Sequence, residues 1–262
     1  MISEAFASGN SVMHRLDPRL KVIFATAFSF FVALSESFPV LMAGLTVGAG
    51  AVLLARLRLW EVARRLAVIN FFNLILWMVL PITFEGEALY LLGPFTLTRP
   101  GVILSAQITI KSNAILLAFI GLIATSSLAT VGHALNRLHV SGKIVHLLMM
   151  TYRYVFVIEQ EYRRLVNAAR MRSFQPGTNL HTYRTYAYLF GMLLVRASAR
   201  AGRVYQAMLC RGFHGRFYCL HRFAFTRTDR IWAVLMSGII VLMAVLQRMD
   251  SEIIRWAHTI RY

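Results

Sequence analysis

Two short segments, residues 168–174 and 207–213, repeat a pattern of residue types suited to recognising a protein surface. Each ends in an arginine, a residue with little or no side chain, and a phenylalanine; the matching residues are Met171, Arg172, Ser173 and Phe174 in the first and Cys210, Arg211, Gly212 and Phe213 in the second. Arginine carries a planar fork of donors that matches a carboxylate, and phenylalanine can anchor in an apolar pocket. The small residue between them permits close backbone approach. The pattern predicts two similar helix tips, each inserted into a groove of a protein partner.

The amino-acid composition indicates a membrane protein. Hydrophobic residues make up 58% of the chain and charged residues 15%, whereas about a quarter of an ordinary soluble domain is charged. The net charge of +17 would otherwise suggest a nucleic-acid partner. The apolar runs argue against that class, and only Tyr183, Tyr186 and Tyr188 approach the stacking aromatics that it would use.

Five apolar stretches are long enough to be considered as membrane-spanning helices, which need about 20 residues each. Four of them lie in a membrane region, residues 1–130, and the fifth lies in a final region, residues 231–262, that ends in a tail. The approximate bounds of the five spans are 20–36, 37–55, 66–84, 102–128 and 231–247. The first twelve residues contain Glu4 and no basic residue, so we expect an uncleaved first span instead of a signal peptide.

Lysine and arginine collect before the first span, between the second and third, and throughout residues 129–230. Short basic loops stay in the cytoplasm, so the N-terminus and the 131–230 region are expected there. The tail departs from this rule, because Arg248, Arg255 and Arg261 would lie outside. Cys210 and Cys219 are expected to stay reduced thiols in the cytosol.

The basic region between the fourth and fifth spans is patterned as two long amphipathic helices. The first covers about 140–172 and is stopped by residues 174–177, and the second covers about 183–211 and ends at Gly212. On the second helix one side carries Arg196, Arg200, Arg203 and Arg211, and another carries Leu193, Ala197, Ala201, Val204 and Met208. Binding to anionic lipid headgroups is an alternative explanation of the arginine row, but it does not explain the repeated tip.

Several residues inside the spans are candidates for helix packing. Gly44 and Gly48 stand one turn apart in the second span, and small residues permit close helix contact in lipid. Asn70 and Asn73 share a face of the third span and could hydrogen-bond a neighbouring helix. Lys111 is the one charge well inside a span, and we expect its ammonium to snorkel to the headgroups of the outer interface.

The N-terminal residues 14–21 read His-Arg-Leu-Asp-Pro-Arg-Leu-Lys. Asp17 and Pro18 predict the start of the first helix, as an N-cap followed by proline at the first helical position. Lys21 would snorkel.

Other functions find less support in the sequence. A metal-binding chain would need closely spaced ligands, and the candidates are scattered: His133, His139, His146, His181, His214, His221, Cys210 and Cys219. An independent transporter would show inverted repeats with interrupted helices. An intramembrane enzyme would need a nucleophile or base, which Asn70 and Asn73 do not supply.

The chain resembles the transmembrane, or T, component of energy-coupling-factor (ECF) transporters, in the CbiQ-like branch associated with cobalt or nickel uptake. The resemblance is carried by residues 14–21, by the Ala-Arg-Gly-like motifs at 171–173 and 210–212, and by the layout of four spans, an arm and a closing span. Met171 and Cys210 stand where the family has alanine, and Ser173 stands where it has glycine.

The resemblance implies an all-α integral membrane protein of about five transmembrane helices with a cytoplasmic arm of two coupling helices, in the plasma (inner) membrane of a prokaryote. It implies that Arg172 and Arg211 dock into two ATPase subunits and that a separate substrate-binding membrane subunit completes the assembly, with or without a small accessory membrane subunit. The chain would be no enzyme and bind no cofactor or metal; ATP and magnesium would belong to the ATPases, and the partner subunit would carry a cobalt ion, or nickel, as substrate. The sequence agrees in lacking a G-x-x-x-x-G-K-[ST] loop. The alternatives are the same role in a nickel or vitamin importer, or an independent membrane transporter whose basic arm binds lipid.

Overall fold

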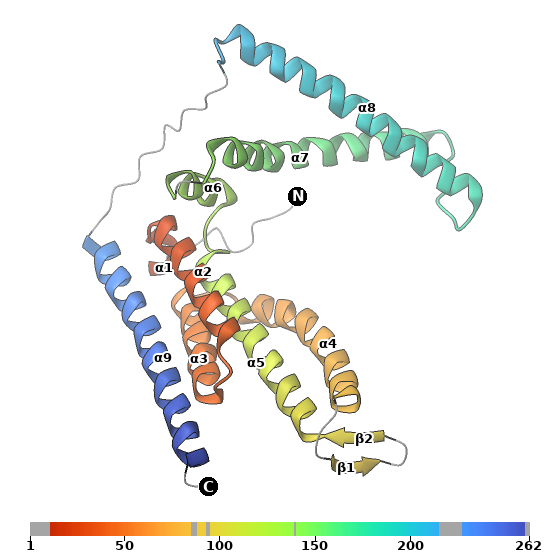
Figure 1. The fold of residues 1–262 in the computed structure, drawn as a ribbon. Coiled ribbons are helices and arrows are strands. Elements are labelled where there is room, and N and C mark those ends of the chain that lie inside the picture. The colour runs from red at the N-terminus through yellow and green to blue at the C-terminus, as the bar shows by residue number, and fades with distance from the viewer. Residues whose placement is uncertain (1–10, 85–87, 93–94, 139, 215–226, 260–262) are drawn as a thin grey trace. The chain divides into compact units, whose positions relative to one another are not determined.

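The computed structural model describes residues 11–84, 88–92, 95–138, 140–214 and 227–259 (Figure 1). These residues form nine helices and one short hairpin; their bounds are α1 Val12–Arg15, α2 Pro18–Leu34, α3 Phe38–Leu54, α4 Leu59–Thr83, β1 Ala88–Leu92, β2 Phe95–Thr98, α5 Arg99–Leu122, α6 Leu128–Arg137, α7 Gly142–Met171, α8 Leu180–Cys210 and α9 Arg227–Thr259. The chain divides into a membrane unit, Glu4–Ala134 with Phe223–Tyr262, and an arm unit that contains Leu135–Arg222.

The membrane unit is built around α3 and α5, which pack closely against each other (Figure 1). α2 packs on α5 and on α9, α9 also packs on α3, and α4 packs on α5. The core consists of apolar side chains from these helices; among the most buried are Phe28, Val32, Leu41, Ala114, Ala118 and Met243. Outside this core many large apolar side chains stay exposed, which is expected of helices whose solvent is lipid.

Three helices of the described part are long and apolar enough to cross a membrane: α4, α5 and the Arg227–Met249 portion of α9. α2 and α3 have 17 residues each, or about 25 Å at 1.5 Å per residue, slightly less than a hydrocarbon core of about 30 Å. The prediction of an all-α membrane protein is confirmed, and the structure adds a short antiparallel hairpin, β1–β2, that the sequence patterns do not predict.

Three expected spans have different ends in the structure. The fifth was expected at 231–247, but α9 runs from Arg227 to Thr259. The third was placed at 66–84, but α4 begins at Leu59, because Arg64 and Arg65 interrupt an apolar run without interrupting a helix. The fourth was placed at 102–128, but α5 ends at Leu122. The Thr125 hydroxyl bonds back to the Leu122 carbonyl at 2.9 Å, so a polar side chain terminates this helix before the apolar pattern ends.

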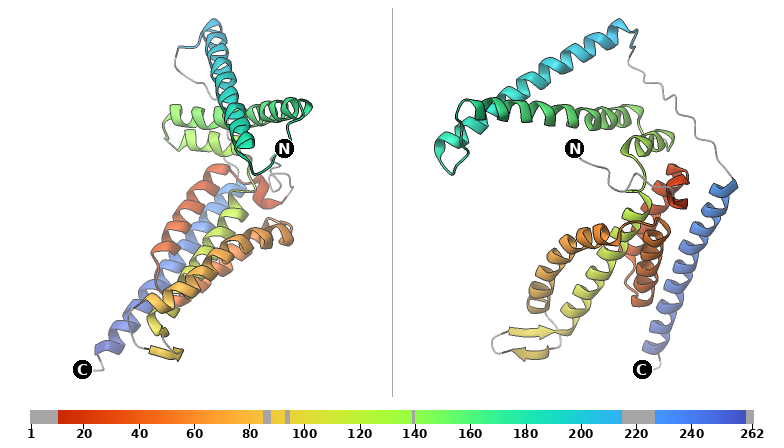
Figure 2. Two further views of the ribbon diagram at one scale, coloured as in Figure 1. Left: turned by 90° about the vertical axis from the view of Figure 1, so that its right-hand side faces the viewer. Right: turned by 180° about the vertical axis from the view of Figure 1, so that it is seen from behind.

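In the arm unit, α7 and α8 are long helices that lie across each other (Figure 2). They match the two helices expected at 140–172 and 183–211 to within three residues at each end. α8 starts three residues earlier than expected because the Asn179 side chain caps it, accepting a 2.9 Å hydrogen bond from the Thr182 backbone N–H. The short helix α6, which precedes them, was not expected.

Candidate functional site

The two arginine-bearing helix ends have the same backbone hydrogen bonds. At the end of α7 the Phe174 N–H donates to the Ala169 carbonyl at 3.2 Å and the Ser173 N–H to the Arg170 carbonyl at 3.0 Å. At the end of α8 the Phe213 N–H donates to the Met208 carbonyl at 3.1 Å and the Gly212 N–H to the Leu209 carbonyl at 2.9 Å; both sets are the paired bonds of a Schellman cap. The repeated sequence pattern therefore corresponds to a repeated three-dimensional structure, which we call the α7 tip (residues 171–174) and the α8 tip (residues 210–213).

The small residue of each tip has a conformational role. Ser173 has φ 64° and Gly212 has φ 77°, so both lie in the left-handed region that ends a Schellman cap. Glycine adopts this conformation without steric cost, whereas a residue with a Cβ does so at roughly 1 kcal/mol. The small residue was expected to permit close approach of a partner, and the left-handed backbone gives a second reason for it that needs no partner.

Exchanging the residue types at this position should change the stability of each helix end in opposite directions. We expect Ser173→Gly to stabilise the last turn of α7, and Gly212→Ala to destabilise the last turn of α8, each by roughly 1 kcal/mol. Amide hydrogen exchange at residues 170–174 and 209–213 measures this. Equal exchange in Gly212→Ala and the wild type would contradict the cost assigned to the left-handed conformation.

Both tip arginines are exposed and occupy the C-cap position of their helices. A positive charge is favourable there, because the last carbonyls of a helix carry partial negative charge. Among the described residues neither guanidinium forms an ion pair, in contrast to Arg163, Arg164 and Arg196 of the same unit. Arg172 and Arg211 therefore present their donors to the surroundings of the arm.

The tip phenylalanines pack within the arm unit. Phe174 is half-buried, with its ring centroid 5.7 Å from that of Tyr186 in an edge-on contact and 6.3 Å from the ring of His181. Phe213 is also half-buried and lines the groove between α7 and α8. These rings were expected to anchor in a partner's pocket, whereas in the structure they pack against their own unit and leave the arginines as the outward-facing groups.

A groove of about 590 Å³ separates part of α7 from part of α8. Its lining includes the apolar row expected on α8, Leu193, Ala197, Ala201, Val204 and Met208, and faces Leu147, Met150 and Tyr154 of α7. Arg196 and Arg200 of the arginine row line the groove as well, so that row does not form one continuous outer face.

An ion pair across the groove was missed by the sequence analysis. The Glu161 carboxylate of α7 accepts from the Arg196 guanidinium of α8, and Arg164 lies 3.6 Å from its other oxygen. The hydrogen bond from Arg196 lowers the pKa of Glu161, so this carboxylate is ionised at neutral pH. The sequence held one indication of this ion pair: Glu161 lies in a strongly basic helical region, where a carboxylate is expected to have a cationic partner.

The packing candidates of the membrane unit lie between helices. A Cβ added to Gly48 of α3 would lie 2.8 Å from the Ala114 carbonyl oxygen of α5, and one added to Gly44 would lie 3.2 Å from Val32 of α2. Asn70 and Asn73 of α4 face α5: the Asn70 side-chain oxygen accepts from Asn113 at 2.9 Å, and the Asn73 amide donates to the Ser112 hydroxyl, also at 2.9 Å.

Lys111 contacts the end of a neighbouring helix. Its ammonium donates to the Ala33 carbonyl oxygen at 3.1 Å, one of the last carbonyls of α2. Helix C-termini leave such carbonyls unpaired and attract cations. Lys111 therefore closes the C-terminal end of α2, which the expectation of a snorkelling side chain did not foresee.

Among the described residues no group of three or more His, Cys, Asp and Glu side chains could hold a metal ion. His139, His221 and Cys219 lie outside the described residues, and Cys210 is an exposed free thiol.

Comparison with known proteins gives consistent matches. The family model CbiQ, described as a cobalt transport protein, matches residues 9–219, a range that includes both tips. The energy-coupling factor transporter transmembrane proteins EcfT of Acidaminococcus fermentans and Brevibacillus brevis are 25% and 28% identical to the chain, each over 91% of this chain and 94% of the relative. The cobalt transport protein CbiQ of Rhodobacter capsulatus is 28% identical over 54% of this chain and 60% of its own length.

Proposed function

Because this chain belongs to the CbiQ family and is a transmembrane component of the ECF transporter type, we propose that its arm couples ATP hydrolysis by two partner ATPase subunits to a separate substrate-binding membrane subunit. The chain itself is a non-catalytic scaffold. Closure of the ATPases displaces α7 and α8, and the displaced helices reorient the substrate-binding subunit, in the manner of a rigid-body transition.

The observation that carries this proposal is the pair of tips with one backbone geometry. Two helix ends with the same hydrogen bonds, each with an exposed arginine at the C-cap, suit two copies of one kind of acidic pocket. Because the arginines are unpaired within the described residues, a carboxylate on a partner can form a bidentate, charge-assisted contact with each. ATP and magnesium are then bound by the ATPases.

The exposed apolar surface of α8 supports the contact with a membrane subunit. Phe190, Leu194 and Val195 are exposed by 59%, 73% and 63% of their surface. A patch of this kind marks a surface that a partner or the bilayer covers. We assign it to the substrate-binding subunit, with the arm on the cytoplasmic side of a prokaryotic plasma membrane and the remaining apolar helices in lipid; a small accessory membrane subunit could contact the same surface.

Cobalt is the proposed substrate, carried by the partner subunit. The description of the family model and the name of the Rhodobacter capsulatus relative support it. The EcfT relatives match more of the chain under a name that specifies no substrate, so nickel and vitamins are the alternatives.

Affinity purification of the wild-type chain from its native membrane tests the proposal. We expect two ATPase subunits and one further membrane protein to co-purify. We also expect proteoliposomes that contain this complex, with an ATP-regenerating buffer inside, to take up radioactive cobalt. Recovery of the chain alone, with its lipids, would contradict the scaffold function and favour a lipid-binding arm. Recovery of the complex with uptake of nickel or a vitamin in place of cobalt would retain the scaffold and correct the substrate.

A further inference from the structure

Residues 123–127 follow α5 and lead through α6 toward the arm unit, and the first turn of α9 lies where the chain has returned to the membrane unit. We call these positions the exit turn and the return turn. Both contact one short stretch, residues 17–21, that begins α2. This stretch belongs to the N-terminal motif that the sequence analysis singled out and to which the proposed function gives no role.

Lys21 holds the exit turn. Its ammonium donates to the Ser126 hydroxyl at 2.8 Å and lies 3.4 Å from the Thr125 hydroxyl, which itself donates to the Leu122 carbonyl at the end of α5. Lys21 is only 2% exposed, so the expectation that it snorkels is wrong. A cation at the C-terminal end of α5 is stabilised by the helix dipole, and this favourable position explains why the side chain turns inward.

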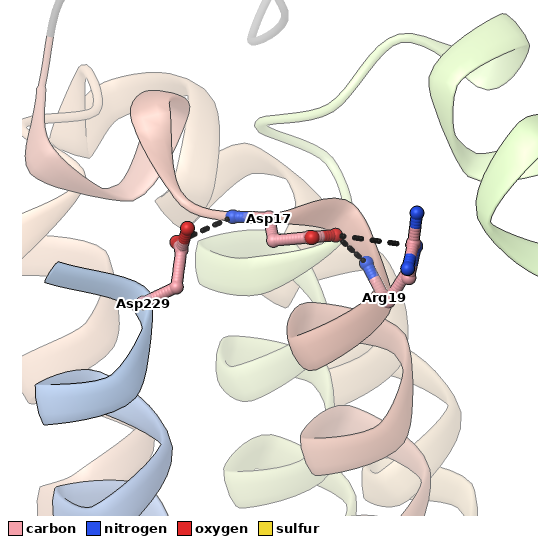
Figure 3. A network of polar contacts seen from close by, with 3 residues as sticks. All are labelled: Asp17, Arg19 and Asp229. Carbon is pink, nitrogen blue, oxygen red and sulfur yellow. Dashed lines mark hydrogen bonds and ion pairs between the residues drawn. The ribbon is translucent and has the colours of Figure 1, made fainter. Parts of the chain in front are cut away.

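Asp17 holds the return turn. Its backbone N–H donates to the Asp229 carboxylate in the first turn of α9 at 3.0 Å (Figure 3). Its own carboxylate accepts from the Arg19 N–H at 2.9 Å and so caps α2. Asp17 and Asp229 are 6% and 3% exposed, which means that the contact is shielded from water.

These contacts fix both turns to α2. Buried hydrogen bonds to charged groups are costly to break, because the charge would be left unpaired away from water. α2 in turn is held in the core by Phe24 and Phe28. A displacement of either turn must therefore move α2 or break a buried polar contact.

We propose that residues 17–21 are the attachment through which arm movement is passed into the membrane unit, with Lys21 and Asp229 as positioning residues. This inference rests on the proposed function. It assigns no contact with ATP, with the ATPases or with substrate to these residues, and so their loss should separate ATP hydrolysis from uptake without dissociating the complex.

The test compares Lys21→Met and Asp229→Ala with the wild type in the complete purified transporter in proteoliposomes. ATP hydrolysis and substrate uptake are measured on the same preparation. We expect the ATPase subunits to co-purify as with the wild type and uptake per ATP hydrolysed to fall about tenfold, within the usual range of coupling between sites. Asp229→Asn keeps an acceptor oxygen and should restore most of the ratio.

Lys111→Met is the matched control. Lys111 also joins α2 and α5, but at the opposite end of α2, through the Ala33 carbonyl. Its loss should leave uptake per ATP unchanged. If Lys21→Met is not recovered in folded form, Ser126→Ala removes only the acceptor and should still lower the ratio.

A normal ratio in Ser126→Ala and Asp229→Ala, or an equal fall in Lys111→Met, would overturn the inference, while the co-purified ATPases would leave the proposed function standing. Failure of the wild-type chain itself to bring down ATPases would instead overturn the proposed function.

Discussion

Charge reversal at both tips, Arg172→Glu together with Arg211→Glu, should abolish co-purification of the ATPase subunits while leaving membrane insertion unchanged. Both arginine side chains are exposed and form no described ion pair, and a charge at a helix end contributes only about 1 kcal/mol, so their replacement leaves the arm folded. Against acidic pockets the new carboxylates replace attraction with repulsion, which costs several kcal/mol at each tip. The measurement is quantification of ATPase subunits that co-purify with the tagged chain.

The matched control carries the same change in net charge elsewhere on the arm. Arg184 and Arg203 are exposed residues of α8 that lie away from its end. Arg184→Glu with Arg203→Glu should retain the ATPases. Equal loss in the control would show that the overall positive charge of the arm, and not the tips, recruits the partners. Arg172→Lys with Arg211→Lys should bind more weakly than the wild type, because an ammonium lacks the bidentate fork.

The second large effect is expected from Gly48→Leu in the membrane unit. A side chain at this position would start 2.8 Å from the Ala114 carbonyl oxygen, 3.1 Å from the Leu117 Cβ and 3.3 Å from the Ala118 nitrogen. Two of these three atoms belong to the α5 backbone, which cannot rotate away as a flexible side chain could. α3 and α5 would have to separate, at a cost of about 3 kcal/mol or more. Thermal unfolding of the detergent-purified chain measures the loss.

Gly50→Ala is the control on the same helix. A Cβ at Gly50 meets nothing within 4 Å, so this change should be neutral or stabilising by up to about 1 kcal/mol through helix propensity. A melting temperature of Gly48→Leu as high as that of Gly50→Ala would mean that α3 and α5 are not in close contact in the protein.

The sequence predicted the helices of the arm and the membrane character of the rest because these depend on local patterns. The apolar rows, the proline and glycine stops and the repeated tip motif lie within windows of a few turns. The hairpin β1–β2 and helix α6 were missed since both are short and lie next to strongly apolar runs.

Contacts between distant residues could not be predicted in the same way. Lys21 and Lys111 were both expected to snorkel, because a single sequence shows a charge near an apolar run but not which helix end lies beside it. Lys21 of α2 instead reaches Ser126, which lies just beyond the C-terminal end of α5, and Lys111 of α5 reaches Ala33 near the C-terminal end of α2. The left-handed backbone of Ser173 likewise results from the helix cap, and a serine in the sequence does not by itself predict that conformation.

The geometry of the tips has a consequence for comparing such chains across species. If the backbone requires a left-handed residue between arginine and phenylalanine, then asparagine and aspartate, which tolerate that conformation better than other side chains, are acceptable substitutes for glycine. A valine or isoleucine there would be strongly disfavoured even though neither is large. Searches for equivalent tips should therefore score this site by backbone tolerance and not by side-chain volume, and should give little weight to the position before the arginine, since Met171 is 89% exposed.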